Sequence, residues 1–352
     1  MHSDLTSVLT QVGKPLEQHL SADGSRLLLL PYGGRVLGLF APGCDENFFW
    51  THPALASGES AQAFFHSNDW HNTGGDRTWL APEADIFLPK FPDTGIYQVP
   101  VALDPGSYEI VGAGPALRFE TKFTVTLSRS GAQVEGLIAK SWGPALNPLR
   151  HEPLWRELAG VAFAGYTQET SLELSSSNSA PVGLWNLLAL PEGGEVIIPT
   201  HTREEPRVCF GPVAPSDVVV TEHLVRFRTG GTGVRKIGLR AVSSTGRIGY
   251  IYPNGKDWSL VVRNFTVNPS GEYIDVPWEK PDPTRDSVYS TQACSVHNEL
   301  GFFCELEYHA PAIGAGTGRT RSHDASQVWA FRGSQGAIQR VAGELLSPEA
   351  VV

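Results

Sequence analysis

The sequence predicts an all-β fold, a large antiparallel sandwich with few short helices. Three observations lead to this prediction. Residues 119–127 alternate between apolar and polar side chains, which is typical of a strand with one side facing solvent. Turn signals recur between short apolar runs, and the 37 Gly and 26 Pro residues are spread along the chain. The glycine patterns of nucleotide-binding βαβ folds are absent from the sequence.

Several other segments have strand or hairpin patterns. Residues 171–177 alternate like 119–127, and residues 301–308 form a compact apolar-and-acidic strand. Two turn sequences, each flanked by apolar runs, predict hairpins: Pro191-Glu192-Gly193-Gly194 between 183–190 and 195–199, and Pro253-Asn254-Gly255-Lys256 between 248–252 and 258–262.

Helical segments are few. Candidates are residues 59–65 and 152–158, together with a short helix within residues 4–20 that is broken near Gly13. The sequence has no internal repeat, low-complexity tract or break in composition. We therefore expect one sandwich domain over residues 1–352, in which residues 1–25 form an N-terminal extension.

The composition excludes some classes of partner. Hydrophobic residues make up 41% and charged residues 18% of the chain, which is globular composition. The net charge of −10 disfavours nucleic acid, because binding to phosphates needs a basic surface. No apolar run approaches the roughly 20 residues that span a bilayer, and the N-terminus lacks a signal-peptide pattern. We expect a cytoplasmic protein that binds neither nucleic acid nor membrane.

Nothing in the sequence indicates a cofactor. The four cysteines are scattered without CxxC or CxxH spacing, and no nucleophile motif such as GxSxG occurs. His66 and His71, with Asp69 between them, are the one candidate for a divalent metal, but their spacing matches no zinc signature. We therefore expect no metal and no other cofactor.

Residues 66–85 (HSNDWHNTGGDRTWLAPEAD) form the most polar candidate site. Gly74 and Gly75 allow positive φ and close approach of a ligand. Arg77 offers a planar fork for hydroxyls or an anion, and an aromatic face could stack on a sugar ring. The alternative is a surface loop in which Arg77 pairs with Glu83 or Asp85. The candidate residues of this segment are His66, His71, Asp76, Arg77, Trp79 and Glu83.

A second candidate site lies on the late strand. Glu305, Glu307 and His309 are two residues apart, so they share one strand face while Leu306 points to the other. A carboxylate with a raised pKa in such a row could act as a general base. A solvent-facing strand surface is the alternative. His201 follows Pro199 at a strand end, where cleft residues are expected.

Four stretches resemble the galactose mutarotase-like supersandwich proteins, most closely a bacterial branch of unknown function. They are residues 33–39 with 47–50, residues 74–83 (GGDRTWLAPE), residues 178–199, and residues 305–308, and the likeness extends over about residues 28–332. The resemblance implies two large antiparallel sheets and a sugar-like ligand in a concave cleft. It also implies a late general-base Glu, matched by Glu305 or, more closely, Glu307, and a mid-chain general-acid His, where this sequence has Trp185.

The resemblance leads to a functional expectation, an aldose 1-epimerase-like enzyme that acts on a free sugar or short saccharide. Glu307 or Glu305 would take the proton of the anomeric hydroxyl, and His71 or His201 would protonate the ring oxygen. The substrate-binding candidates are His66, Asp76, Arg77, Trp79, Glu83, Trp185 and His309. A lyase or hydrolase of the same fold and a non-catalytic sugar-binding protein are the alternatives.

Overall fold

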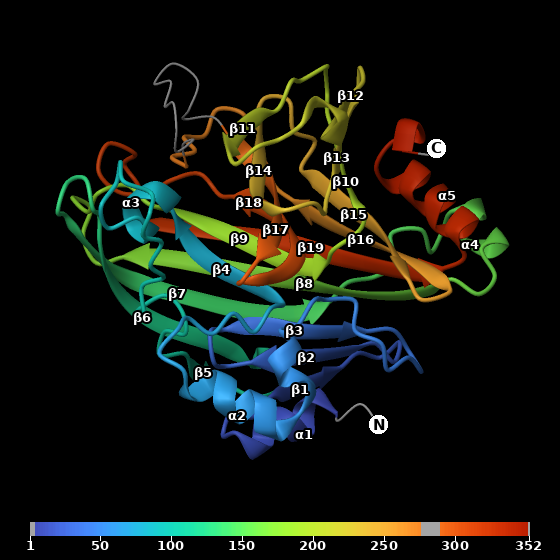
Figure 1. Ribbon diagram of the computed structural model, residues 1–352, viewed down its shortest axis with the longest axis horizontal. Coiled ribbons are helices and arrows are strands. Elements are labelled where there is room, and N and C mark those ends of the chain that lie inside the picture. Colours follow the sequence, from blue (N-terminus) through green and yellow to red (C-terminus); the bar gives the residue numbers. More distant parts are fainter. Residues whose placement is uncertain (1–3, 276–288, 351–352) are drawn as a thin grey trace.

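Two antiparallel β-sheets pack face to face in the computed structural model, which describes residues 4–275 and 289–350 (Figure 1). Over these residues the first sheet has nine strands, in the spatial order β1 (Glu17–Leu20), β2 (Arg26–Leu30), β3 (Arg35–Phe40), β4 (Asp76–Ala81), β9 (Gly183–Pro191), β18 (Gly301–His309), β17 (Tyr289–Asn298), β14 (Gly233–Arg240) and β11 (Arg207–Phe210). The second has ten, in the order β12 (Val218–Val220), β13 (Leu224–Arg228), β10 (Glu195–Pro199), β15 (Arg247–Asn254), β16 (Asp257–Phe265), β19 (Arg321–Gly333), β8 (Ala162–Leu174), β7 (Gln133–Pro144), β6 (Arg118–Thr126) and β5 (Glu109–Val111). The expected all-β sandwich is confirmed.

Short helices lie around the sheets. The α-helices are α1 (Leu5–Gln11), α2 (Gly58–His66), α3 (Glu83–Phe87), α4 (Pro153–Glu157) and α5 (Gln335–Leu345), and the 3₁₀ helices are Pro53–Ala56, Gly114–Ala116, Pro215–Asp217 and Pro348–Ala350. Figure 1 shows α1 and α2 beside β1 and β2 at the bottom, with α4 and α5 next to each other at the right. Within the described parts of the chain, no helix is long and apolar enough to cross a membrane.

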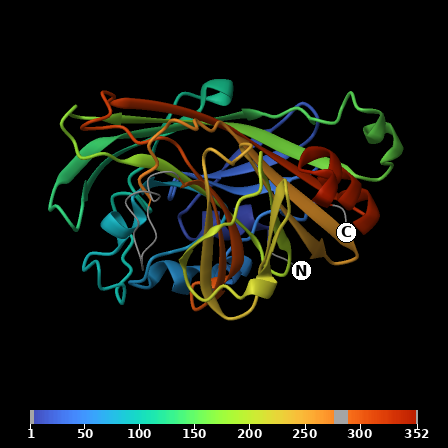
Figure 2. The ribbon, with the colours of Figure 1, turned by 90° about the horizontal axis from the view of Figure 1, so that it is seen from above.

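The main hydrophobic core lies between the sheets. Leu188, Leu306 and Tyr308 of the nine-stranded sheet pack in one cluster with Tyr166 and Val261 of the ten-stranded sheet. Figure 2 shows the long strands β8 and β19 running across the molecule in one layer. Because side chains alternate along a strand, the residues next to these core positions point away from the other sheet. The candidate site lies on that outward face.

The structure confirms most of the expected elements. The strands expected over 119–127, 171–177 and 301–308 are part of β6, β8 and β18, and the helices expected over 59–65 and 152–158 are α2 and α4. The turn at 253–256 closes a true hairpin, in which Asn254 of β15 pairs with Asp257 of β16. At the N-terminus, α1 ends before Gly13, and β1 then pairs with β2 at the sheet edge.

The hairpin expected around Pro191–Gly194 is wrong. The strand before the turn, β9, pairs with β4 and β18 in the nine-stranded sheet. The strand after it, β10, pairs with β13 and β15 in the ten-stranded sheet. The turn therefore carries the chain from one layer to the other. A glycine-containing turn between two apolar runs gives the same sequence signal in both cases, because the signal describes the turn and not the pairing of the strands.

Candidate functional site

Strand register brings the candidate residues of three strands onto one face. Across β4, β9 and β18, Arg77 lies opposite Leu187, which lies opposite Glu307. Residues that lie directly opposite each other in an antiparallel pair share a face. The same face therefore carries Arg77, Trp79, Trp185, Leu187, Glu305, Glu307 and His309, and, through β17 and β14, Cys294 and Lys236.

This face forms the floor of a cavity of about 270 Å³, here called the inner cavity. Trp70, Trp79, Trp185 and Tyr97 contribute aromatic surface to its lining. The charged side chains that line it are Arg77, Glu83, Lys236, Glu299, Glu305 and Glu307. An apolar, aromatic cavity with a few convergent polar groups is the usual form of a small-molecule site.

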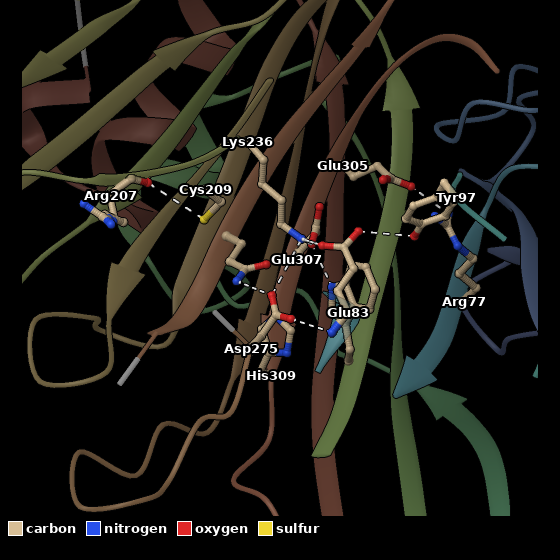
Figure 3. Close-up of polar contacts among 12 residues, drawn as sticks. Arg77, Glu83, Tyr97, Arg207, Cys209, Lys236, Asp275, Glu305, Glu307 and His309 are labelled. Atoms are coloured by element: carbon tan, nitrogen blue, oxygen red, sulfur yellow. Dashed lines mark hydrogen bonds and ion pairs between the residues drawn. The ribbon is translucent and has the colours of Figure 1, made fainter. Parts of the chain in front are cut away.

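Lys236 is the centre of the charged cluster (Figure 3). Its Nζ lies 2.9 Å from Glu307 Oε2, 3.1 Å from Glu83 Oε2 and 4.0 Å from Asp275 Oδ2, and its side chain is 1% exposed. Burial alone would lower the pKa of Lys236, but the charges of Glu307, Glu83 and Asp275 outweigh burial and hold this pKa well above its ordinary value. Lys236 is therefore a fixed positive charge between carboxylates.

Glu83 and Glu307, the two carboxyl groups that contact Lys236 Nζ, have pKa values near neutrality. Burial raises the pKa of Glu307 to about 7, and Lys236 opposes this shift. Burial raises the pKa of Glu83 to about 8, again opposed by Lys236. Trp185 Nε1 donates a hydrogen bond of 2.7 Å to Glu307 Oε2, and the Tyr97 hydroxyl donates one of 3.2 Å to Glu83 Oε1. At pH 7 the site therefore contains a group able to accept a proton beside one able to donate it.

Arg77 and Glu305 form the second ion pair of the inner cavity (Figure 3). Arg77 NH1 lies 2.7 Å from Glu305 Oε1, and the guanidinium carbon lies 4.2 Å from the centre of the Trp79 ring. Trp79 is itself held by a hydrogen bond of 3.1 Å from its Nε1 to Asp104. The Arg77 side chain is thus fixed beside an aromatic face, with its charge compensated by Glu305.

His309 lies behind the cavity wall. Its ring stacks on Trp185 with centroids 5.7 Å apart and planes at 12°. Burial lowers the pKa of His309 to about 4, so the imidazole is neutral at pH 7. Its Nε2 lies 3.8 Å from Asp275 Oδ2. Asp275 also accepts hydrogen bonds from the Glu83 backbone N–H at 2.7 Å and from Gln292 Nε2 at 2.9 Å. These contacts place Asp275 behind Glu83 and His309.

One set of potential metal ligands lies in the inner cavity. The ligand atoms of Cys294, Glu305 and Glu307 lie within 4.8 Å of one another. Arg77 and Lys236 already compensate the two carboxylates. Burial raises the pKa of Cys294 well above its ordinary value, which keeps the thiol protonated, and only the thiolate is a good ligand. The charges at this position therefore disfavour a metal.

The structure brings most of the predicted site residues together. Arg77, Trp79, Glu83, Trp185, Glu305 and Glu307 line the inner cavity, and His309 stacks behind it. The alternative, in which Arg77 pairs with Glu83 or Asp85 on a surface loop, is wrong: Arg77 is buried and pairs with Glu305. Four candidates lie elsewhere: His66, His71, Asp76 and His201.

Asp76 points to the wrong side of the sheet for a substrate contact. It precedes Arg77 on β4, and successive side chains of a strand point to opposite faces. Its carboxylate is buried between the sheets, where Arg263 donates to both oxygens at 2.8 and 2.7 Å and the Tyr166 hydroxyl donates at 2.6 Å. Asp76 therefore belongs to the core and not to the cavity.

The three histidines lie outside the inner cavity. His71 Nδ1 lies 2.6 Å from the Tyr32 hydroxyl, and its ring packs against Phe64 and Phe65. His66 is exposed at the end of α2, with its Nδ1 2.7 Å from the Gln62 carbonyl oxygen. His201 is exposed just after β10, which belongs to the other sheet. The structure thus places neither expected general-acid histidine, His71 or His201, in the inner cavity.

Three important residues had no clear sequence signal. Lys236 follows Arg235 in a strand that reads like one with a solvent-facing side. Tyr97 lies in an irregular segment, and Asp275 lies in a loop. Their roles depend on pairings with Glu83, 153, 14 and 192 positions away along the chain. Sequence periodicity, which is local, contains no information about such contacts.

Gly74 and Gly75 serve the fold and not a ligand. Both have positive φ, +87° and +74°. A Cβ on Gly74 would lie 2.3 Å from the Trp50 carbonyl oxygen, and one on Gly75 would lie 2.3 Å from the Val36 carbonyl oxygen. The close approach predicted at these glycines is therefore that of neighbouring backbone.

A substitution at Gly75 is expected to destabilise the protein. Gly13→Ala provides a matched comparison, since Gly13 has φ +71° with nothing within 4 Å of a new Cβ. Gly13→Ala should cost about 1–2 kcal/mol for the left-handed backbone, and Gly75→Ala should cost about 1–3 kcal/mol more because of the clash. Denaturant unfolding of both variants measures the difference, and equal losses would contradict the close packing at Gly75.

Comparison with known proteins places the chain in a family. No curated protein matches it in sequence. Residues 6–349 match the profile of a family of unknown function (DUF6786). A protein from Escherichia coli K12, provisionally assigned as an aldose 1-epimerase, has a similar structure: the TM-score is 0.50 at 11% identity, over 92% of this chain and 100% of that chain. A galactose mutarotase-like protein from Lactobacillus casei ATCC 334 gives a TM-score of 0.46 at 10% identity, over 90% and 99% of the two chains. The chain belongs to the DUF6786 family and has the galactose mutarotase-like fold.

Proposed function

We propose that the chain binds a sugar in the inner cavity and interconverts its anomers by acid/base catalysis. The observation that carries this proposal is the position of Glu83 and Glu307 on either side of Lys236, at the floor of a cavity walled by tryptophans. Both carboxyl groups titrate near pH 7, where proton transfer to and from hydroxyl groups is most effective.

The shape and charge of the cavity support a neutral sugar ring. Its volume, about 270 Å³, lies just below the range of roughly 300–1,000 Å³ for ligand pockets, which suits one ring. Trp70 offers an aromatic face to the C–H side of a pyranose. Arg77 is already paired with Glu305, and Lys236 with Glu307. An acidic sugar, which a polysaccharide lyase would require, finds no uncompensated cation among the described residues that line the cavity.

The geometry supports a specific division of roles. Glu307, ionised, accepts the proton of the anomeric hydroxyl, while Trp185 N–H and Lys236 stabilise its negative charge. Glu83, protonated, donates a proton to the ring oxygen as the bond between that oxygen and the anomeric carbon breaks. Rotation of the open-chain aldehyde and closure on its other face reverse both transfers and restore the two carboxyl groups. Glu83 thus takes the role that the family resemblance gives to a histidine.

The test is anomer exchange measured by NMR on a panel of aldohexoses. Glu307→Gln keeps the size of the side chain but removes the base, so the exchange rate is expected to fall by about 10²–10⁴-fold. Glu169→Gln is the matched control, because Glu169 lies on β8 with its side chain 59% exposed. If wild type and Glu307→Gln exchange every sugar at the uncatalysed rate, the epimerase proposal is overturned. Binding without exchange would leave a sugar-binding protein.

A further inference from the structure

A second cavity, here called the outer cavity, adjoins the inner one. Its volume is about 610 Å³. The two cavities have four lining residues in common: Trp70, Tyr97, Glu299 and Leu300. These shared residues form the junction, so a ligand in the inner cavity can extend past Trp70 into the outer one. The proposed reaction on a single sugar ring takes place in the inner cavity and does not require the outer one.

One residue in the wall of the outer cavity has a buried hydrogen-bond donor without a partner. Asn72 is among the residues that line this cavity, and it is 3% exposed. Asn72 Oδ1 accepts a hydrogen bond of 3.2 Å from the Gly74 backbone N–H, whereas Nδ2 has no partner among the residues that the structure describes. An unsatisfied buried donor is unfavourable. Rotation of the Asn72 side chain toward the cavity would let Nδ2 donate to a ligand hydroxyl and remove this cost.

The lining of the outer cavity favours a neutral, hydroxyl-rich ligand. Asp69 and Glu299 supply carboxylate acceptors, and Trp70 supplies an aromatic face at the junction. No Lys or Arg is among the described residues that line it, so an anionic group would meet only carboxylates. Acceptors for hydroxyl hydrogens, an amide donor and an aromatic face are together the groups that a sugar ring needs.

We propose that the outer cavity is a subsite for a second sugar ring, so that the preferred ligand is a neutral disaccharide whose reducing-end ring occupies the inner cavity. This inference rests on the proposed function of the inner cavity. The ring at Glu307 and Glu83 keeps its free anomeric hydroxyl, and the ring attached to it passes Trp70 and reaches Asn72. Ser67, Asp69, Trp70 and Asn72, all from the polar 66–85 segment, thereby contribute to substrate length and not to proton transfer.

The experiment compares affinities by isothermal titration calorimetry. The hexose that binds best is compared with disaccharides that carry it at their reducing end. For glucose these are maltose, cellobiose and lactose. At least one disaccharide is expected to bind 10-fold or more tightly than the hexose. Ser67 is exposed and lines only the outer cavity, so Ser67→Trp should fill this cavity and reduce the ratio of the two affinities to about one.

Ser177→Trp is the control, because Ser177 is exposed on the loop after β8 and lines neither cavity. Its affinity ratio should equal that of wild type. Equal affinities for hexose and disaccharides in the wild type would overturn the subsite while leaving the proposed function intact. Absence of both hexose binding and anomer exchange would overturn the proposed function and the subsite together.

Discussion

Replacing Arg263 with methionine is expected to lower the free energy of unfolding by about 3–5 kcal/mol. Arg263 is fully buried on β16, and its guanidinium donates two hydrogen bonds to Asp76, on β4 of the other sheet. Without it, the Asp76 carboxylate would remain between the sheets with only the Tyr166 hydroxyl as a described donor. An uncompensated buried charge is far more costly than the loss of a methylene contact. Denaturant unfolding at pH 7, followed by tryptophan fluorescence, measures the effect.

Two further variants separate the buried charge from other causes. In the double variant Asp76→Asn/Arg263→Met the unpaired charge is absent, so the protein should be more stable than Arg263→Met alone. Arg321→Met removes an exposed partner of Glu173, where the side chains are 75% and 48% exposed, and should change stability by less than about 1 kcal/mol. Equal losses in Arg263→Met and Arg321→Met would contradict a special role for the buried pair.

Local periodicity predicted the fold and one half of the candidate site. The alternation in β6 and the turn at Asn254 and Gly255 depend only on neighbouring residues, so the sequence was sufficient for them. The same is true of Glu305 and Glu307, whose spacing of two puts them on one face wherever the strand lies. The cavity contains both carboxylates, whereas Leu306 packs in the core between the sheets.

The part of the site in residues 66–85 was harder to predict, because it depends on the direction in which each side chain points as well as on composition. The density of polar residues in 66–85 indicated a site but did not say which side chains point into it. The sequence predicts that both Asp76 and Arg77 bind substrate, but adjacent residues on a strand point to opposite faces. Alternation would have separated them if the start of β4 had been known. The position of His71, by contrast, depends on a contact with Tyr32, 39 residues away, which no local pattern contains.

Long-range pairing also explains why Lys236 was missed. Lys236 reaches Glu307 because β14 pairs with β17, and β17 pairs with β18. From the sequence, a lysine in an alternating strand is most simply a solvent-facing residue. The structure buries it instead at the centre of the charged cluster. The stability of the protein should therefore depend on Lys236 and, through its carboxylate partners, on pH.

In the wild type, stability is expected to fall as pH rises from about 4.5 to 8. Burial places the pKa of Glu83 at about 8 and that of Glu307 at about 7, both above the ordinary value of 4.5. Between these values Glu83 and Glu307 bind more protons in the folded protein than in the unfolded chain, so these two groups favour unfolding as pH rises. His309, whose pKa burial lowers to about 4, acts in the opposite direction up to about pH 6.5 and offsets part of this trend. Lys236 limits this loss because its positive charge stabilises the ionised forms.

Lys236→Met is therefore expected to show a pH-dependent loss of stability. At pH 5 both carboxyl groups are protonated, and methionine fills much of the space of the lysine stem, so the loss should be small. At pH 8 the variant must either bury carboxylates without a cation or take up protons, and the loss should reach about 3–5 kcal/mol. Lys122→Met, at an exposed position on β6, should show no such trend. The measurement is denaturant unfolding of both variants at pH 5 and pH 8. A packing defect at position 236 would lower the free energy of unfolding equally at both pH values, whereas loss of the Lys236 charge would lower it more at pH 8.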